Sequence, residues 1–197
     1  MEKIFLNLGS GPRSALPKDA PEFYGWREVR VDINPMANPD KVASLTDMKG
    51  VIEDNFADFV FCSHAVEHFY AHEVHSVLAE TVRVLKPEGV AVFRTPDLEQ
   101  VMRLIDPEDL EKPIYSSPAG DITALDILYG HRASIEDGDQ FMAHKSGFTE
   151  EYFAKLLLDA GFSEVRTEKG SSIDFWAQAG FKRLAMQHQV AALKASL

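Results

Sequence analysis

The chain has 197 residues, of which 45% are hydrophobic, 10% aromatic and 26% charged. These fractions are those of an average globular protein and exclude a disordered, fibrous or coiled-coil chain. The length accommodates one domain, residues 1–197, and leaves no room for a second. With 20 basic and 31 acidic residues the net charge is −11. Because this charge repels phosphate backbones and anionic lipids, it disfavours nucleic acid as a partner, and we expect no membrane partner.

The sequence contains a single cysteine, Cys62, so an intramolecular disulfide is excluded. The apolar run near the N-terminus is shorter than the roughly 7 to 15 residues of a signal-peptide core. No run approaches the roughly 18 apolar residues that suggest a membrane span. We therefore expect a soluble, cytoplasmic protein in which Cys62 fills space in the core.

Short apolar runs alternate with turn signals over the first half of the chain. They predict buried strands at residues 4–8, 29–33, 41–44, 59–62 and 89–94. Apolar residues at helical spacing predict a helix over 72–85, ended by the Lys-Pro-Glu-Gly run at 86–89. Between the first two strands, Pro12, Pro17 and Pro21 leave room for at most a turn or two of helix. Such alternation is typical of a parallel sheet with crossover connections.

The second half of the chain begins with a polar, proline-bearing stretch, residues 99–145, which we interpret as an insertion with short helices. Thr149 caps a helix that Gly161 ends. Two more strands and a last helix follow, and their expected ranges are 163–168, 173–179 and 181–197.

Two glycines follow the first predicted strand directly, in the run Gly9-Ser10-Gly11. Glycine permits a tight turn in which backbone amides approach a ligand closely. Asp32 ends the second predicted strand, 21 residues beyond Gly11. A carboxylate at that place can accept hydrogen bonds from the two hydroxyls of a ribose. The pattern therefore predicts a ligand that carries a nucleoside.

The same segment departs from the fingerprint of dinucleotide-binding proteins. Ser14 stands where that fingerprint has its third glycine, and Pro12 and Pro17 interrupt the helix that would follow. A pyrophosphate bound at a helix N-terminus is therefore poorly supported. A nicotinamide enzyme remains as a lower-ranked alternative.

Four motifs together resemble those of the class I S-adenosylmethionine-dependent methyltransferases, most closely a small bacterial type-11-like subgroup. In chain order they are Leu6–Pro12, Gly25-Trp26 ahead of Val31–Pro35, Asp58–Phe69 with its Ser-His-x-x-Glu-His pattern, and Arg83–Gly89. The resemblance covers residues 4–97 well and residues 146–179 moderately. It implies an α/β fold, with a Rossmann-like, seven-stranded, mostly parallel sheet and a helical insertion after strand five.

The resemblance also implies how S-adenosylmethionine would be bound. Gly9, Ser10 and Gly11 would lie under its methionine part, and Asp32 would hold the ribose. Ile33 would pack against the adenine.

The remaining implied contacts lie farther along the chain. Ser63 and His64 would border the sulfonium and the substrate. In such enzymes an acid that ends strand three commonly contacts the adenine amino group, but here Ser44 stands at that position, beside Leu45. Either Ser44 or Asp47 would make the contact.

Methyl transfer to a hydroxyl or an amine also requires removal of a proton from the acceptor, and imidazole titrates near neutral pH. The candidate catalytic residues are therefore His64, His131 and His144. His64 follows a central strand, where open α/β sheets bind ligands, and His144 resembles the family's histidine before a Gly-Phe-Thr run. A structural role in a loop is the alternative for His131 and His144. Asp97 either faces the acceptor or caps the next helix.

The run from His64 to His68 also matches His-x-x-Glu-His, a zinc-peptidase motif in which one helix presents both imidazoles to the metal. A predicted strand ends just before His64, so the two histidines are not expected to share a helical face. We therefore predict no metal site and rank a zinc hydrolase low. The main alternative to an enzyme is a catalytically silent cofactor-binding or partner subunit of the same fold.

The resulting hypothesis is S-adenosylmethionine-dependent methyl transfer to a small-molecule or glycan-like acceptor bound beneath residues 99–145. The first predicted strand begins at residue 4, so a lid over the site is expected from this insertion or from the second subunit of a homodimer. The sequence does not specify whether O, N or C is methylated.

Overall fold

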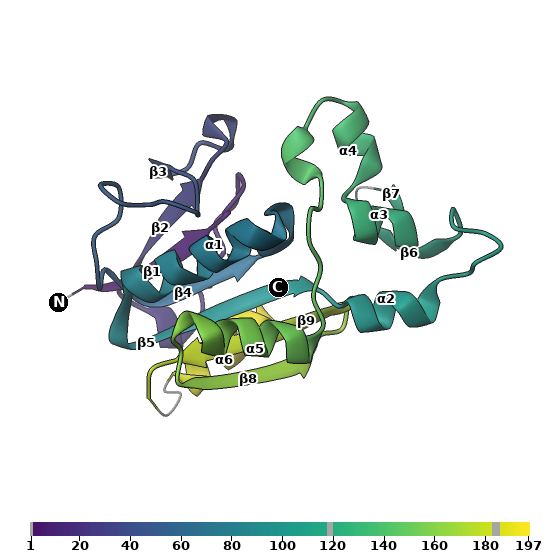
Figure 1. Ribbon diagram of the computed structural model, residues 1–197. Coiled ribbons are helices and arrows are strands. Elements are labelled where there is room, and N and C mark those ends of the chain that lie inside the picture. The colour runs from purple at the N-terminus through teal and green to yellow at the C-terminus, as the bar shows by residue number, and fades with distance from the viewer. Residues whose placement is uncertain (1, 118–119, 183–185) are drawn as a thin grey trace.

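The computed structural model describes residues 2–117, 120–182 and 186–197. Its main feature is one seven-stranded sheet in the order β3-β2-β1-β4-β5-β9-β8 (Figure 1). The pairs among the first five strands are parallel, and β9 is antiparallel to both of its neighbours. The strands are β1 (Lys3–Leu8), β2 (Trp26–Asp32), β3 (Lys41–Val42), β4 (Ala57–Ser63), β5 (Leu85–Pro96), β8 (Glu164–Lys169) and β9 (Asp174–Gly180). The predicted seven-stranded, mostly parallel sheet is confirmed.

Two helices, α1 (Ala71–Val84) and α5 (Glu150–Ala160), pack on one face of the sheet. Successive residues of a strand point to opposite faces. Accordingly, Leu6 and Leu8 of β1 belong to the core cluster under these helices, whereas Phe5 belongs to the cluster on the other face. Both faces of β1 are therefore buried, which explains why its residues 4–8 are apolar except for the buried Asn7.

The opposite face has no full crossover helix between β1 and β2. That connection holds only the short 3₁₀ turn Pro21–Phe23, as the prolines predict. The C-terminal helix α6 (Gln187–Ala195) packs beside this turn and joins the same core cluster, where the rings of Phe5 and Phe59 stack with centroids 5.3 Å apart. The predicted helix over 181–197 is thus shorter than expected, and residues 183–185 lie outside the described residues.

Several predicted strand boundaries are wrong. The strand expected at 29–33 is β2, which already begins at Trp26. Two further differences have a visible cause. The Lys-Pro-Glu-Gly run at 86–89 does not separate helix from strand, because β5 already begins at Leu85 and passes through an irregularity in its pairing with β4. Proline has no backbone N–H, so it cannot donate a hydrogen bond to a neighbouring strand. A bulge at this point allows Pro87 to lie within β5 without such a bond to β4. At the other boundary, β3 ends at Val42, and Ser44 instead pairs with Asp47 across a tight turn.

The insertion after β5 lies beyond the end of the sheet at which β5 finishes (Figure 1). It has a small core of its own, formed by Val101, Ile122, Ala124 and Ile127. The short helices are present as predicted, together with a two-stranded hairpin that the sequence analysis missed. The elements are α2 (Leu98–Leu104), β6 (Pro113–Ser117), β7 (Gly120–Thr123), α3 (Ala124–Tyr129) and α4 (Arg132–Glu136).

A return segment, residues 143–148, leads from the insertion back to α5 and is visible in Figure 1 as the green chain between them. Its Lys145 and Ser146 amides donate hydrogen bonds to the Glu67 carbonyl (2.8 and 3.1 Å). At its end, the Phe148 carbonyl accepts a hydrogen bond from the Leu98 amide (2.9 Å). The return segment therefore lies across the carboxyl ends of β4 and β5.

Within the described part of the chain, every helix is too short or too polar to traverse a lipid bilayer.

A buried ion pair attaches the β3–β4 connection to α1. The guanidinium of Arg83 donates to both carboxylate oxygens of Glu80, at 2.8 Å each, and also to the Ile52 carbonyl (2.9 Å). The Met48 amide donates to the same Glu80 carboxylate (2.6 Å). The hydrogen bonds from Arg83 hold the pKa of Glu80 below its ordinary value, although burial acts in the opposite direction.

We predict that Glu80→Ala lowers the free energy of unfolding by about 2 to 4 kcal/mol, because it removes two charge-assisted hydrogen bonds from the Arg83 guanidinium and leaves the buried Met48 amide without its acceptor. Arg83 keeps its hydrogen bonds to the Ile52 carbonyl and the Asp54 carboxylate. The change is measured by urea denaturation at neutral pH. Asp159→Ala, which removes an exposed pair with Lys155, is the control and should change stability by less than about 0.5 kcal/mol. Because the pKa of Glu80 is lowered by folding, its contribution should fade as the pH falls below the ordinary glutamate pKa. Equal effects of the two variants would contradict the assignment.

Candidate active site

The Gly9-Ser10-Gly11 turn lies at the carboxyl end of β1, and both glycines are left-handed, with φ of +64° and +55°. The amides of Gly9 and Ser10 both donate to the Val31 carbonyl of β2 (2.9 and 3.2 Å). A Cβ atom at Gly9 would lie 2.5 Å from the Cβ of Ala65. The turn therefore requires glycine both for its backbone conformation and for the close approach of the chain after β4.

The carboxylate of Asp32 connects this turn to the end of β2. One of its oxygens accepts a hydrogen bond from the Gly11 amide (2.8 Å), and the other accepts one from the Asn34 amide (2.9 Å). A carboxylate has about four acceptor positions, so two remain for hydroxyl groups of a ligand. Beside it, Ile33 is 47% exposed. The predicted proximity of the glycine turn and the acid is therefore observed, next to an exposed apolar side chain.

The turn after β3 contains the two candidates for contact with the adenine. The Ser44 hydroxyl lies 2.8 Å from that of Thr46, so it is engaged within the turn. Asp47 is exposed, and its carboxylate accepts a hydrogen bond from the Lys49 amide (3.2 Å). Leu45 is buried and lies against Gly9. These contacts favour Asp47 over Ser44 as the polar group available to a ligand.

His64 follows the half-buried Ser63 at the end of β4 and has a left-handed backbone, with φ of +48°. This conformation is uncommon for a residue other than glycine. Its amide donates to the Arg94 carbonyl of β5 (2.8 Å), and its side chain is 44% exposed. The Nδ1 atom lies 3.3 Å from a carboxylate oxygen of Glu67. His64 is thus held at the edge of the sheet, partly open to solvent.

Glu67 is a site residue that the sequence analysis considered only as part of the zinc-peptidase motif. It is 1% exposed, and its carboxylate accepts a hydrogen bond from the Thr95 hydroxyl (3.2 Å). Burial acts to raise its pKa, but the hydrogen bond from His64 and the nearby imidazoles outweigh burial and lower it. Burial, together with the charge of Glu67, raises the pKa of the Cys62 thiol, which is fully buried as predicted. The centre of the site is therefore an ionised, buried carboxylate.

His68 and His144 face each other beside Glu67, with ring centroids 4.9 Å apart. The Nδ1 atom of His68 lies 3.1 Å from the Ala143 carbonyl oxygen, and that of His144 lies 2.8 Å from the Ile127 carbonyl oxygen. Because a carbonyl only accepts, each Nδ1 carries a proton, and in the neutral ring the lone pair is on Nε2. Burial lowers the pKa of His144 below its ordinary value, which favours this neutral form.

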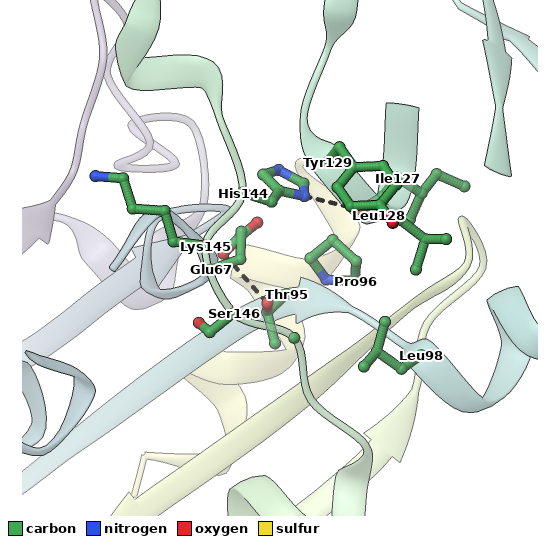
Figure 2. A pocket seen from close by; sticks show the side chains of 11 residues that line it. Glu67, Thr95, Pro96, Leu98, Ile127, Leu128, Tyr129, His144, Lys145 and Ser146 are labelled. Carbon is green, nitrogen blue, oxygen red and sulfur yellow. Dashed lines mark hydrogen bonds between the residues drawn. The ribbon is translucent and has the colours of Figure 1, made fainter. Parts of the chain in front are cut away.

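A cavity of about 230 Å³ adjoins this group (Figure 2). Glu67, Thr95 and His144 form its polar side, and Leu128 and Tyr129 of the insertion form an opposing wall. Figure 2 shows His144 lying between the Glu67 carboxylate and this wall. The cavity thus joins polar groups from the sheet edge to apolar groups from the insertion.

Two other candidate residues have local structural contacts instead. The ring of His131 caps α4 through Ser134, with Nδ1 2.7 Å from its hydroxyl, and His131 is not among the residues that line the cavity. Asp97 is buried and accepts a hydrogen bond from the Glu99 amide (2.9 Å), so of its two alternatives the cap of α2 is the one observed.

The His-x-x-Glu-His run does not form one helix. His64 precedes the 3₁₀ turn Val66–His68 and has a left-handed backbone, so its imidazole and that of His68 do not share a helical face. This geometry differs from that of a zinc peptidase, as the sequence analysis expects. The imidazole that His68 meets instead comes from His144, in the return segment.

Comparison with known proteins gives a consistent result. Residues 6–93 match the family model described as a methyltransferase domain. No match was found among curated proteins. The expected resemblance to class I methyltransferases agrees with this match over residues 6–93 and, for the fold, with solved structures of similar architecture.

Three such structures illustrate the likeness, and at these identities they show the fold alone. A protein from Pyrococcus horikoshii has a TM-score of 0.63 at 21% identity, covering 92% of this chain and 83% of its own. A SAM-dependent methyltransferase from Archaeoglobus fulgidus has a TM-score of 0.57 at 14% identity, covering 90% and 85%. A possible histamine N-methyltransferase from Thermotoga maritima has a TM-score of 0.56 at 15% identity, covering 92% and 84%.

We predict that Gly9→Ala destabilises the protein more than Gly25→Ala does. Both glycines are left-handed, but a Cβ at Gly25 would meet nothing within 4 Å. Gly25→Ala should therefore cost only the left-handed strain, roughly 1–2 kcal/mol. Gly9→Ala should cost roughly 1–3 kcal/mol more, because of overpacking against Ala65. Thermal denaturation measures the difference, and equal losses would show that the close contact at Gly9 is unimportant.

Proposed function

We propose that this chain, which has the class I methyltransferase fold and matches the methyltransferase domain family over residues 6–93, transfers a methyl group from S-adenosylmethionine to a small-molecule or glycan-like acceptor. The observation that carries the proposal is the hydrogen bond between the Gly11 amide and the Asp32 carboxylate. It places a glycine turn and a carboxylate together outside the carboxyl ends of neighbouring parallel strands, where open α/β sheets bind ligands.

The residues around Asp32 fit the cofactor well. The two free acceptor positions of the carboxylate suit the ribose hydroxyls, and the exposed Ile33 suits the face of the adenine. The glycine turn, which has no side chain at Gly9 or Gly11, suits the methionine part. Ser63 and His64, at the end of β4, are the residues proposed to border the sulfonium.

The cavity beside Glu67 and His144 is the proposed acceptor site. When bound, S-adenosylmethionine supplies an electrophilic methyl group, which the acceptor's lone pair takes while the carbon–sulfur electron pair returns to sulfur. The protein's part is to align the two reactants and to exclude water. The insertion residues Leu128 and Tyr129 provide the apolar wall for this. His144, which lines the cavity, is the group proposed to contact the acceptor atom and to take its proton. His64 is not a lining residue, and its proposed contact with the acceptor would come from the end of β4.

We predict that Asp32→Ala weakens binding of S-adenosylmethionine by about 1 to 3 kcal/mol, because it removes charge-assisted hydrogen bonds to the ribose. Titration calorimetry measures the affinity. Asp32→Asn separates the effect of charge from that of shape, since it keeps one acceptor oxygen.

Asp40→Ala is the matched control for this experiment. Asp40 is also a carboxylate that accepts a backbone amide of β2, from Arg30 at 2.8 Å, but it is exposed on the far side of the β2–β3 connection. Removal of the Asp40 carboxylate should leave the affinity for S-adenosylmethionine unchanged. Tight binding of NADH in place of S-adenosylmethionine by the unaltered chain would overturn the proposal.

We also predict that His144→Ala retains the affinity for S-adenosylmethionine but lowers methyl transfer at least tenfold, because His144 lines the acceptor cavity and not the cofactor region. Transfer of a labelled methyl group to a panel of hydroxylated and amino small molecules and glycans measures turnover. His75→Ala, an exposed histidine of α1, is the control and should behave as the unaltered chain. Equal turnover of all three proteins would assign His144 a structural role, and binding without transfer to any acceptor would favour a catalytically silent subunit.

A further inference from the structure

Three potential metal ligands from two distant parts of the sequence meet at one point beside the cavity. The carboxylate of Glu67 and the ring nitrogens of His68 and His144 offer one ligand atom each, all within 4.8 Å of one another. We infer that these three side chains form a binding site for a divalent transition-metal ion of the zinc type. This site is separate from the proposed cofactor region at Asp32, but it shares Glu67 and His144 with the proposed acceptor cavity. With a metal bound, His144 would be a ligand and would not take the acceptor's proton, so the inference is tested independently of the proposed function.

The orientation of the two imidazoles supports the inference. Each is fixed by a hydrogen bond from Nδ1 to a backbone carbonyl, of Ala143 for His68 and of Ile127 for His144. Histidine ligands of metals almost always donate their other ring N–H to a carbonyl or carboxylate in this way, which fixes the tautomer and orients the ring. In both rings, the Nε2 lone pair is therefore available to coordinate a metal ion.

The burial of the Glu67 carboxylate also favours a bound cation. The side chain is 1% exposed, and a buried carboxylate is costly unless it is paired. Within residues 2–117, 120–182 and 186–197, no lysine or arginine forms a salt bridge with it, and its side-chain hydrogen bonds to His64 and Thr95 are long, at 3.3 and 3.2 Å. The nearest basic side chain is His64, which pairs with Glu67 as an ion only when its ring is protonated. A metal ion among the three ligands would add a permanent positive charge.

The ligand set indicates which metal is preferred. Two imidazole nitrogens and one carboxylate suit zinc and similar transition metals, whereas magnesium and calcium prefer oxygen ligands. Zinc–nitrogen bonds of about 2.0–2.1 Å place ligand atoms roughly 3.4 Å apart in a tetrahedral site. The three side chains would therefore close by about an ångström on binding. Because Glu67 and His144 also line the cavity, a fourth ligand can come from there.

The test is titration calorimetry of the full chain, freed of metal by a chelator, with zinc chloride and separately with magnesium chloride. We expect one zinc ion per chain and much weaker binding of magnesium. His144→Ala and Glu67→Gln should each weaken zinc binding roughly a hundredfold or more, since even the loss of a residue that only supports a ligand costs 10–100-fold. His75→Ala, which removes an exposed histidine near His72 on α1, should have no effect.

A second measurement does not depend on the folding of any variant. Cobalt added to the unaltered chain should produce visible absorption bands of a nitrogen- and oxygen-ligated site, and stoichiometric zinc should abolish them. Absence of one-to-one zinc binding, unchanged affinity in Glu67→Gln, or loss of binding in His75→Ala would overturn the inference. Titration of the same metal-free chain with S-adenosylmethionine separates the two proposals. Binding of the cofactor without binding of zinc refutes only the metal site. Binding of zinc without binding of the cofactor refutes only the proposed function.

Discussion

The hydrogen bond from the Gly11 amide to the Asp32 carboxylate is the constraint on which the site depends. It ties the turn after β1 to the end of β2, and the same carboxylate also orders the chain at Asn34. The two strands end at the same level, because Leu8 pairs with Val31 in the parallel register. One acidic side chain thus orients two loops while it keeps acceptor positions toward the space above the sheet. A nucleoside-sized ligand could be held there without any change in the strands.

The return segment is the second constraint, because it brings the insertion to the sheet edge. Its amides at Lys145 and Ser146 pair with the Glu67 carbonyl, so the turn after β4 and the return segment are locked together. His144 precedes these two amides and is thereby placed against His68. The polar side of the cavity is assembled in this way from residues nearly 80 positions apart in the sequence, beside a wall that the insertion supplies.

Much of the fold could be predicted from the sequence because local patterns agree with the final structure. The apolar residues of β1 are buried on both faces. Thr149 caps the start of α5 and the left-handed Gly161 ends it, as their residue types predict. The prolines before β2 also excluded a crossover helix, and α6 packs beside the turn that replaces it. The start of β5 could not be predicted, since a bulge allows Pro87 to lie within a strand.

The candidate site could be predicted only in part, because some of its residues are brought together by local structure and others only by tertiary packing. The glycine turn and Asp32 are close in the sequence, because only one connection and one strand separate them. Their proximity could therefore be predicted from their spacing. The grouping of Glu67, His68 and His144 depends instead on the path by which the insertion returns to the sheet. That path cannot be deduced from the spacing of these residues in the sequence. The sequence favoured His144 over His131 only through its likeness to a histidine before a Gly-Phe-Thr run, and the tertiary structure separates the helix cap at His131 from the cavity-lining His144.

The most direct test of the account is a crystal structure of the chain with S-adenosylhomocysteine. The account predicts that both ribose hydroxyls donate to the carboxylate of Asp32, with the adenine against Ile33 and the sulfur directed toward the cavity lined by His144 and Tyr129. A ribose bound away from Asp32, or a sulfur directed away from that cavity, would contradict it.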